Sequence, residues 1–509
     1  MSMPARSNIT LIRGLTLIAA ASIVIGNVIG TGVFLKTRVM TCNVGTPGMV
    51  ITVWIAAGIL SLAGALTYAE LAAMMPRAGG EYVFVREAYG APLGFLYGWM
   101  QVFIAKTGSQ ASVAVALAIF LNDLTGGRLN HIYYTLKIPS FDLFFFTFPG
   151  YQIPFGDLQV VALSAILIVT LINCATVKVS GNIAAFLTVI KIALVLGVGF
   201  GAFLLARGGD WAHFSQSNVQ CPALPDIALW TLDCGRCFGV NDAARYGMAG
   251  FGAAMLGALW GYDGWNNLTL VAGEVKNPQR NIPLALIGGM FIIISLYVFV
   301  NIAYFYALDP TTIAGITKES SVAREVALTF LGPVAISLMA AALMSSSIGT
   351  LHTSILTGAR VPYAMSRDRL FFQNLARLSP RTHVPIGALI VQGIWASILA
   401  LSGSFDTLTD YVIFGSWIFY GLVTASVFIF RRRMPNAERP YRAWGYPVVP
   451  ALFLLVTAWL LINTLLTTPV QALIGIGLIL LGLPVYYYWA HHNRVTYQGA
   501  PLEDEEEHS

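Results

Sequence analysis

The stretch Gly26-Asn27-Val28-Ile29-Gly30-Thr31-Gly32-Val33-Phe34 interrupts a long apolar run near the start of the chain. Each glycine costs about 1 kcal/mol of helix propensity relative to alanine. Lipid cannot satisfy any backbone group that the glycines release. The stretch therefore predicts unwound backbone that faces a cavity or another helix, with close helix packing through small residues as the alternative.

A later apolar run carries a similar interruption, Gly257-Ala258-Leu259-Trp260-Gly261-Tyr262-Asp263-Gly264-Trp265-Asn266-Asn267. The two interruptions lie five apolar runs apart, each in the first helix of a predicted five-helix half. Because five is an odd number, the two halves have inverted topology in a membrane. Paired interruptions at corresponding positions of inverted halves indicate the binding site of a transporter.

The composition points to a membrane protein. Of 509 residues, 57% are hydrophobic and only 10% are charged, whereas soluble domains are about 25% charged. This excludes a soluble enzyme, a nucleic-acid-binding protein and a secreted disulfide scaffold. The net charge of +5 is therefore no sign of nucleic-acid binding, because in membrane proteins the placement of Lys and Arg matters more than their sum.

Long apolar runs predict an all-α membrane protein of about twelve transmembrane helices. They lie near 14–40, 47–75, 91–122, 155–176, 181–206, 247–275, 282–308, 329–363, 385–402, 407–430, 447–467 and 470–490. Lys and Arg are about twice as frequent on the side that holds the N-terminus, so both termini are predicted to be cytoplasmic. The first run is interpreted as a span that stays rather than a cleaved signal peptide.

These spans divide the chain into seven predicted regions. They are a cytoplasmic N-terminus (1–13), a first five-helix repeat (14–206), an extracytoplasmic loop with cysteines (207–246), a second five-helix repeat (247–431), a cytoplasmic loop (432–446), two last helices (447–490) and an acidic cytoplasmic tail (491–509).

The chemistry of a broken helix suggests the ligand. The N-terminal end of the second half presents free N–H groups and the positive end of the helix dipole, which suit a carboxylate. The C-terminal end of the first half presents free carbonyls, which suit an ammonium group. Two such breaks that face each other predict a receptor for an α-amino acid.

Four segments resemble one family: GNVIGTGVF (26–34), YAELAAMMPRAGGEYVFVREAYG (68–90), LWGYDGWNNLTLVAGEVKNPQRNIPLAL (259–286) and SSSIGTLHTSILTGARVPYAMSRDRL (345–370). They are similar to the amino acid–polyamine–organocation superfamily, and within it to L-type amino-acid transporters and bacterial serine/threonine exchangers. The resemblance covers about residues 10–490. It implies a LeuT-like fold of 5+5 inverted repeats plus two helices, with helices 1 and 6 discontinuous. It also implies sodium-independent exchange of neutral L-α-amino acids by alternating access.

The resemblance also implies roles for particular residues. The substrate carboxylate would meet the N–H groups of Thr31 and Gly32, and the ammonium group would meet carbonyls of Val28, Trp260 and Asp263. Trp260 would be the aromatic gate over the substrate; the alternatives are an ordinary core aromatic there and a local backbone role for Thr31. The implied substrate-binding residues are Val28, Ile29, Gly30, Thr31, Gly32, Trp260, Gly261, Asp263 and Asn266, with Asn266 lining the pocket.

Charged residues in the middle of a membrane span are functional candidates by default. Asp263 either recognises a cationic substrate side chain or caps the broken helix by accepting backbone N–H groups. Substrate charge preference is therefore open between neutral amino acids alone and neutral plus cationic ones.

Lys191, in the fifth predicted span, needs a buried partner. The candidates are the carbonyl of Gly26 and hydroxyls of Ser345–Ser347, of which Ser346 and Ser347 are the main ones. Lys191 resembles the family lysine that replaces a sodium ion, which implies sodium-independent transport. The alternatives are a proton-coupled symporter in which Lys191 loses its proton, and a lysine that only ties helices together.

Other charged residues of the spans are given structural roles: Lys106, His352 and Arg360. No phosphate-binding loop is present, so direct ATP drive is not predicted, and neither a cofactor nor a metal site is expected.

The cysteines and loops carry the remaining expectations. One disulfide is predicted among Cys221, Cys234 and Cys237, while the part of Cys42 in the pairing stays open. L-type light chains of eukaryotes bond to a heavy chain through a cysteine after helix 3, but residues 123–154 contain none. A disulfide-linked heavy chain is therefore not expected, and a bacterial inner membrane is the predicted location. The expected partners are amino-acid substrates and the lipid bilayer, and no nucleic acid.

Overall fold

The computed structural model describes residues 10–138, 141–143, 146–148, 151–218, 237, 245–317, 320–402, 405–467 and 469–492. Among these, eight helical segments are long and apolar enough to cross a membrane, and two shorter helices are also apolar. Every predicted span contains helix, and the spans 14–40 and 247–275 are interrupted. The all-α class is confirmed, whereas the count of twelve stays a prediction.

The described part of the chain from Leu17 to Leu205 contains nine helical segments and two small sheets. The helices are α1 (Leu17–Val28), α2 (Gly32–Val44), α3 (Pro47–Met74), α4 (Glu81–Tyr89), α5 (Ala91–Met100), a π-helical turn (Gln101–Ala105), α6 (Lys106–Leu124), α7 (Asp157–Asn173) and α8 (Val177–Leu205). Between α6 and α7, β1 (Ile132–Ile138) pairs antiparallel with β4 (Tyr151–Gly156), and β2 (Phe141–Leu143) pairs with β3 (Phe146–Phe148).

The second half is helical in all of its described elements. The longer helices are α9 (Gly247–Tyr262), α11 (Pro278–Ala307), α13 (Val322–Leu331), α14 (Val334–Gly358), α16 (Ile386–Ser402), α17 (Phe405–Arg433), α18 (Val448–Thr467), α19 (Pro469–Leu480) and α20 (Gly482–His492). Short helices are α10 (Asn267–Leu270), α12 (Pro310–Gly315) and α15 (Arg360–Arg367), with single turns at Trp211–Ser215, Ala272–Glu274 and Gln373–Ala376.

Both interruptions that the glycines predict are present. The first apolar run stops being helical after Val28 and resumes at Gly32. The second leaves the helix after Tyr262 and resumes at Asn267, and Gly264 adopts a φ of +99° that favours glycine. Glycine thus makes the second turn possible without strain.

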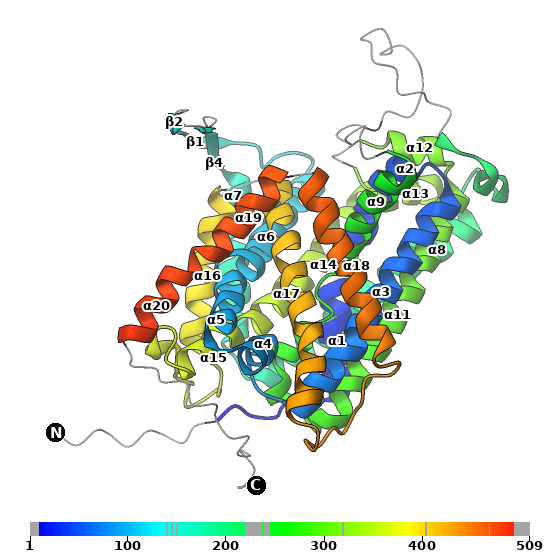
Figure 1. Cartoon of the computed structure of the whole chain (residues 1–509). Helices are drawn as coiled ribbons and strands as arrows, with labels where there is room; N and C mark the ends of the chain where they lie inside the picture. Colours follow the sequence, from blue (N-terminus) through cyan, green and yellow to red (C-terminus); the bar gives the residue numbers. More distant parts are fainter. Residues whose placement is uncertain are drawn as a thin grey trace.

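The first apolar run lies in the middle of the bundle, where α1 packs against α8, α11 and α14, and α2 packs against α9 (Figure 1). Its most apolar window is 78% buried, compared with 22% for the segments Val448–Leu466 and Ala472–His492. The outer helices expose large apolar side chains, such as Leu455 and Leu473, which suit contact with lipid. The central position of α1 and α2 places the first break away from lipid.

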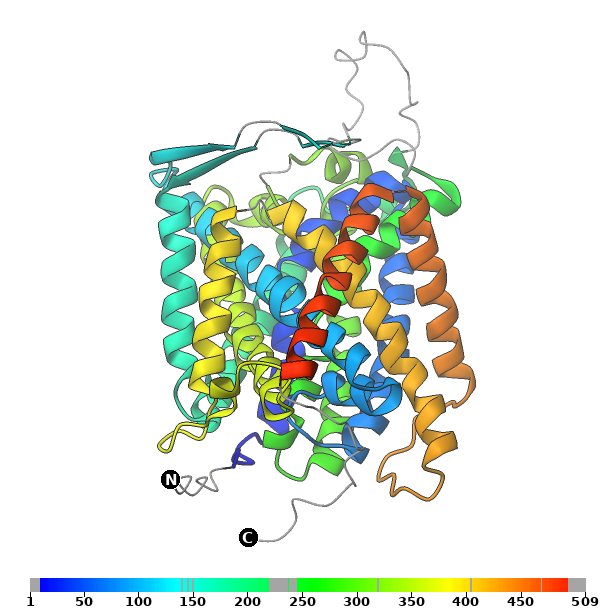
Figure 2. The same ribbon diagram turned by 60° about the vertical axis from the view of Figure 1, so that its left-hand side comes forward.

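The two ends of the bundle differ, as Figure 2 shows. One end carries the β-strands and is called the hairpin side; the other carries the first and last described residues, Thr10 and His492, and is called the termini side. On the hairpin side, Cys42 of α2 forms a disulfide with Cys237. The prediction of a disulfide within the loop after α8 was therefore wrong for Cys237; Cys221 and Cys234 lie outside the described residues. The physical reason is that α2 packs along α9, so the chain that leads into α9 meets the end of α2, where the Tyr246 N–H donates to the Asn43 carbonyl at 2.7 Å.

Buried ion pairs close the termini side. Arg360 of α15 donates through Nε to Glu274 Oε1 at 2.7 Å and through its terminal nitrogen to Oε2 at 2.9 Å, and both side chains are fully buried. This gives Arg360 the structural contact that its sequence position suggested. Just before α1, the Leu15 N–H donates to the Glu274 carbonyl at 2.9 Å, which ties the start of α1 to the chain after α10. Arg431 of α17 pairs with Glu70 of α3 in the same bidentate way.

Candidate functional site

The first break offers backbone N–H groups. Ile29, Gly30 and Thr31 separate α1 from α2, and the structure records no acceptor for the Thr31 N–H among the described residues. Gly32 and Val33 begin α2, so their N–H groups have no intrahelical acceptor either. Together with the positive end of the α2 dipole, these groups form a site suited to a carboxylate.

The carbonyls that end α1 are held by side chains from other helices. Lys191 Nζ of α8 donates to the Gly26 carbonyl at 2.6 Å and to Thr350 Oγ1 of α14 at 2.7 Å. The Gly26 contact agrees with the prediction, but the hydroxyl partner is Thr350, not Ser346 or Ser347. Residues 346 and 347 lie about one turn away along α14, so the Ser346 hydroxyl instead reaches the Ile29 carbonyl at 3.2 Å, and Ser347 Oγ has no partner among the described residues.

Tyr297 of α11 joins the two breaks. Its hydroxyl lies 2.7 Å from the Val28 carbonyl and 2.9 Å from the Gly261 carbonyl, and its single proton is shared between them. The Val28 carbonyl also accepts the Gly30 N–H at 2.7 Å. Both lone pairs of Val28 are thus engaged, whereas the Trp260 carbonyl accepts one N–H, that of Asp263, at 3.1 Å.

The breaks approach each other through glycine. A Cβ added at Gly32 would lie 2.6 Å from Gly261 Cα, and one added at Gly261 would lie 2.7 Å from the ring of Trp54. Real Cβ atoms do not approach backbone this closely. Only glycine at position 32 therefore allows α2 to pack directly on α9.

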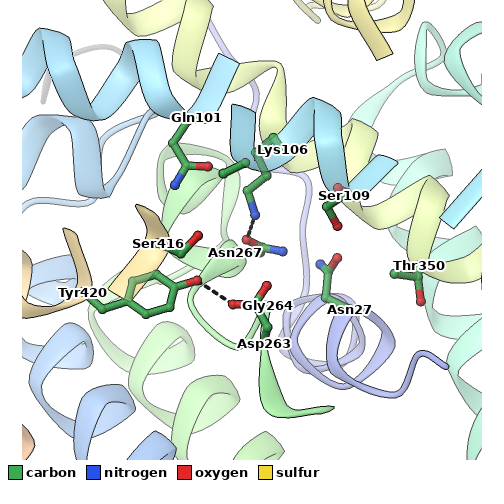
Figure 3. A pocket seen from close by; sticks show the side chains of 12 residues that line it. Asn27, Gln101, Lys106, Ser109, Asp263, Gly264, Asn267, Thr350, Ser416 and Tyr420 are labelled. Atoms are coloured by element: carbon green, nitrogen blue, oxygen red, sulfur yellow. Dashed lines mark hydrogen bonds between the residues drawn. The ribbon is translucent and has the colours of Figure 1, made fainter. Parts of the chain in front are cut away.

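A small polar cavity lies beside the breaks (Figure 3). Its volume is about 30 Å³, which is room for one or two water molecules. An amino acid is larger, so binding requires the surrounding helices to move apart. The lining residues are Asn27, Gln101, Ala105, Lys106, Ser109, Asp263, Gly264, Asn267, Thr350, Ser354, Ser416 and Tyr420.

Of the predicted binding residues, only some line this cavity. Asp263 lines it, whereas the remaining predicted residues of the breaks do not. Trp260 is half-buried on α9, and its role as a gate stays a prediction. Asn267 lines the cavity instead of Asn266, because the Asn266 side chain turns toward α4 and donates to Glu81 Oε1.

Sequence reasoning missed the polar cluster around Lys106. This lysine follows the π-helical turn, and its ammonium group donates to the Asn267 Oδ1 (Figure 3). The Tyr420 hydroxyl donates to Asp263 Oδ1 at 2.7 Å. A lysine in the middle of an apolar span was the signal for this cluster, whereas the sequence offers no comparable signal for Glu81 or Tyr420.

No group of three or more His, Cys, Asp or Glu residues that could hold a metal ion occurs in the described part of the chain. The site offers hydrogen-bonding groups, helix ends and buried charges. These groups can bind and release a zwitterion.

Comparisons with known proteins agree with this chemistry. The amino acid permease family model matches residues 15–488. The large neutral amino acids transporter small subunit 2 of Mus musculus is 29% identical over 483 residues, which cover 93% of this chain and 81% of the relative. The serine/threonine exchanger SteT of Bacillus subtilis is 29% identical over 474 residues, 92% of this chain and 95% of the relative. The human b(0,+)-type amino acid transporter 1 is 27% identical over 483 residues, 94% and 88% of the two chains.

These matches confirm the resemblance to the amino acid–polyamine–organocation superfamily and exclude an enzyme. Together with the apolar helices, they identify an integral membrane protein. Since the family model spans nearly the whole chain, this protein belongs to the amino acid permease family.

Proposed function

We propose that this protein exchanges neutral L-α-amino acids across a membrane by alternating access, without sodium. The observation that carries the proposal is the pair of facing helix breaks, one of which presents to a carboxylate the Thr31 N–H, which has no acceptor in the described part of the chain. Relatives named as a neutral amino acid transporter and a serine/threonine exchanger support it. The substrate would lie between the breaks, in contact with the predicted residues from Val28 to Gly32 and from Trp260 to Asn266.

The proposed architecture is LeuT-like, with twelve membrane helices. Residues 14–206 and 247–431 would form inverted five-helix repeats, and 447–490 would form two further helices. The two breaks, each in the first helix of a repeat, support this division. The Glu70–Arg431 ion pair of the termini side would separate when the site opens toward that side, because it joins elements of both repeats.

Lys191 is the basis for proposing sodium independence. Its ammonium group supplies a fixed positive charge at the carbonyl end of α1, where it binds Gly26 and Thr350. A resident cation leaves no requirement for a bound metal ion at this position. Proton coupling through Lys191 is the alternative mechanism.

We further propose that both termini are cytoplasmic and that the protein resides in a bacterial inner membrane without a disulfide-linked heavy chain. The excess of Lys and Arg on the termini side supports the orientation. The absence of cysteine from 123–154 supports function without a covalent partner.

Purified protein in liposomes tests the proposed function. We expect labelled L-leucine, L-serine or L-alanine to enter only vesicles that contain unlabelled amino acid, at equal rates in sodium and choline chloride. Competition with all common amino acids then ranks the substrates.

Two results would contradict the proposal. Uptake into empty vesicles under an acid-outside gradient would indicate a proton symporter instead. Absence of exchange for every amino acid tested would remove the transport function altogether.

A further inference from the structure

Two carboxyl groups and one ammonium group meet beside the cavity. Lys106 of α6 interacts electrostatically with both Asp263 in the second break and Glu81 of α4. Glu81 is fully buried and Lys106 is 9% exposed, while Asp263 opens onto the cavity. The three groups thus belong to one enclosed site at the point where the second break, α4 and α6 converge.

Side-chain contacts connect the two carboxyl groups. Tyr420 donates to Asp263 Oδ1 at 2.7 Å, and its oxygen lies 3.5 Å from Asn266 Oδ1. Asn266 in turn donates through Nδ2 to Glu81 Oε1. The path from Asp263 through Tyr420 and Asn266 to Glu81 links the cavity to a helix of the termini side.

Tyrosine hydroxyls surround the two carboxyl groups. Glu81 Oε2 accepts a hydrogen bond from the Tyr68 hydroxyl at 3.4 Å. The titratable and charged groups that act on Glu81 or Asp263 are Tyr68 of α3, Tyr97 of α5, Lys106 of α6 and Tyr420 of α17, in addition to each other.

Three other buried cations of the described chain are held elsewhere. Lys191 binds Gly26 and Thr350, Arg360 binds Glu274, and Arg86 binds Asp368. Two carboxylates beside one ammonium group therefore leave the cluster one positive charge short. A buried net charge is costly, so one carboxyl group favours the protonated form.

The surroundings of Glu81 agree with this count. Burial raises the pKa of the Glu81 carboxyl to about 7, although Lys106 and the hydrogen bond from Asn266 act to lower it. The direction of this change agrees with a carboxyl group that favours its protonated form.

We propose that Glu81 and Asp263 together hold one exchangeable proton beside Lys106 while a neutral amino acid is carried, and that a substrate with its own side-chain cation displaces this proton. The inference rests on the proposed exchange function. In such a cycle the protein carries either a neutral substrate with a proton or a cationic substrate without one. The exchange of external arginine for internal leucine then moves one positive charge in each direction and is electrically neutral.

The test uses the wild-type protein in liposomes that contain unlabelled L-leucine and the pH-sensitive dye pyranine. We expect external labelled L-arginine to enter while the interior becomes more alkaline, with about one proton released per arginine. A potassium diffusion potential set with valinomycin should leave the rate unchanged. Because the proton competes with arginine and accompanies leucine, a rise in pH should lower the KM for arginine by up to about tenfold per unit and should not lower the KM for L-leucine.

Variants locate the proton. In Glu81→Gln and Asp263→Asn, the ratio of protons to arginine should fall from about one to zero, whatever rate of transport remains. Glu325→Gln on α13, whose carboxylate binds Ser320 outside the cluster, is the control and should keep the wild-type ratio. Arginine-induced shifts in thermal stability show whether a variant with low transport still binds substrate.

Three results would overturn the inference, in distinguishable ways. Arginine uptake without proton movement and accelerated by an inside-negative potential excludes the shared proton. If arginine and lysine are not transported and do not inhibit leucine exchange, a substrate cation cannot take the place of the proton at this site. Absence of exchange for all amino acids in the wild-type protein would instead contradict the proposed function.

Discussion

The two helix breaks differ in the groups that surround them. The first, Ile29–Thr31, is uncharged, and its carbonyls and those just before it accept hydrogen bonds from Lys191, Tyr297 and Ser346 on three other helices. The second, Asp263–Asn266, has its own carboxylate, which faces the cavity and Lys106. The first break is held by hydrogen bonds from neighbouring helices, and the second presents a carboxylate to the cavity.

This difference suggests a division of labour. The N–H groups of the first break would match the carboxylate that all α-amino acids share. The charged second break matches the side chain, which varies between substrates. Changes around the first break should therefore reduce transport of all substrates alike, while changes around the second should alter selectivity.

The largest effect is expected at the contact between the breaks. Gly32→Ala places a Cβ within 2.6 Å of the Gly261 backbone, so α2 must shift away from α9. A displacement of about 1 Å at a binding site reduces activity by about 100-fold. Proteoliposome exchange of L-leucine measures the loss. Gly48→Ala is the control, since a Cβ there meets nothing within 4 Å; a near-wild-type rate in Gly32→Ala would show that the close approach is dispensable.

Lys191→Met should have the next largest effect. The substitution keeps the length of the side chain but leaves the Gly26 carbonyl without its charged donor, at a cost of about 1–3 kcal/mol. We expect exchange of all substrates to fall by about 30-fold, with normal expression. Lys178→Met, at an exposed position of the same helix, is the control. Unchanged rates in Lys191→Met would remove this lysine from the mechanism.

Tyr297→Phe tests the link between the breaks. The variant loses the hydroxyl that the Val28 and Gly261 carbonyls share, worth about 1 kcal/mol. We expect a fall of about fivefold in the exchange rate, equal for L-leucine and L-serine. Tyr304→Phe on the same helix is a matched control, because the Tyr304 hydroxyl is buried without a partner among the described residues. A change in selectivity rather than rate would contradict the assignment of the first break to the shared groups.

Much of this arrangement could be predicted from the sequence, because its signals are local. Glycines within an apolar run predicted both breaks, and a lysine in the middle of a span predicted the contact of Lys191 with Gly26. These inferences need only the chemistry of lipid and of helix ends. The family match then confirmed the class of protein.

The contacts that depend on helix rotation and on distant segments could not be predicted. Thr350 and Ser346 lie one turn apart on α14, and only the packing of α14 on α1 and α8 decides which hydroxyl meets Lys191. Glu81 begins α4 and is far in sequence from the second break, so its contact with Asn266 is a property of the fold. Cys42 likewise meets Cys237 only because α2 packs along α9.

The smallest effect separates two adjacent serines. Ser346→Ala removes the hydrogen bond to the carbonyl of Ile29, which lies in the break itself. Such a hydrogen bond is worth about 0.5–1 kcal/mol. We expect exchange to slow by about two- to threefold for every substrate. Ser347→Ala removes a buried hydroxyl that has no partner among the described residues, and its rate should match or exceed that of the wild type. Rates measured side by side in proteoliposomes decide the matter: equal losses in both variants would mean that the first break is sensitive to any change on α14, and not to the hydrogen bonds that hold its carbonyls.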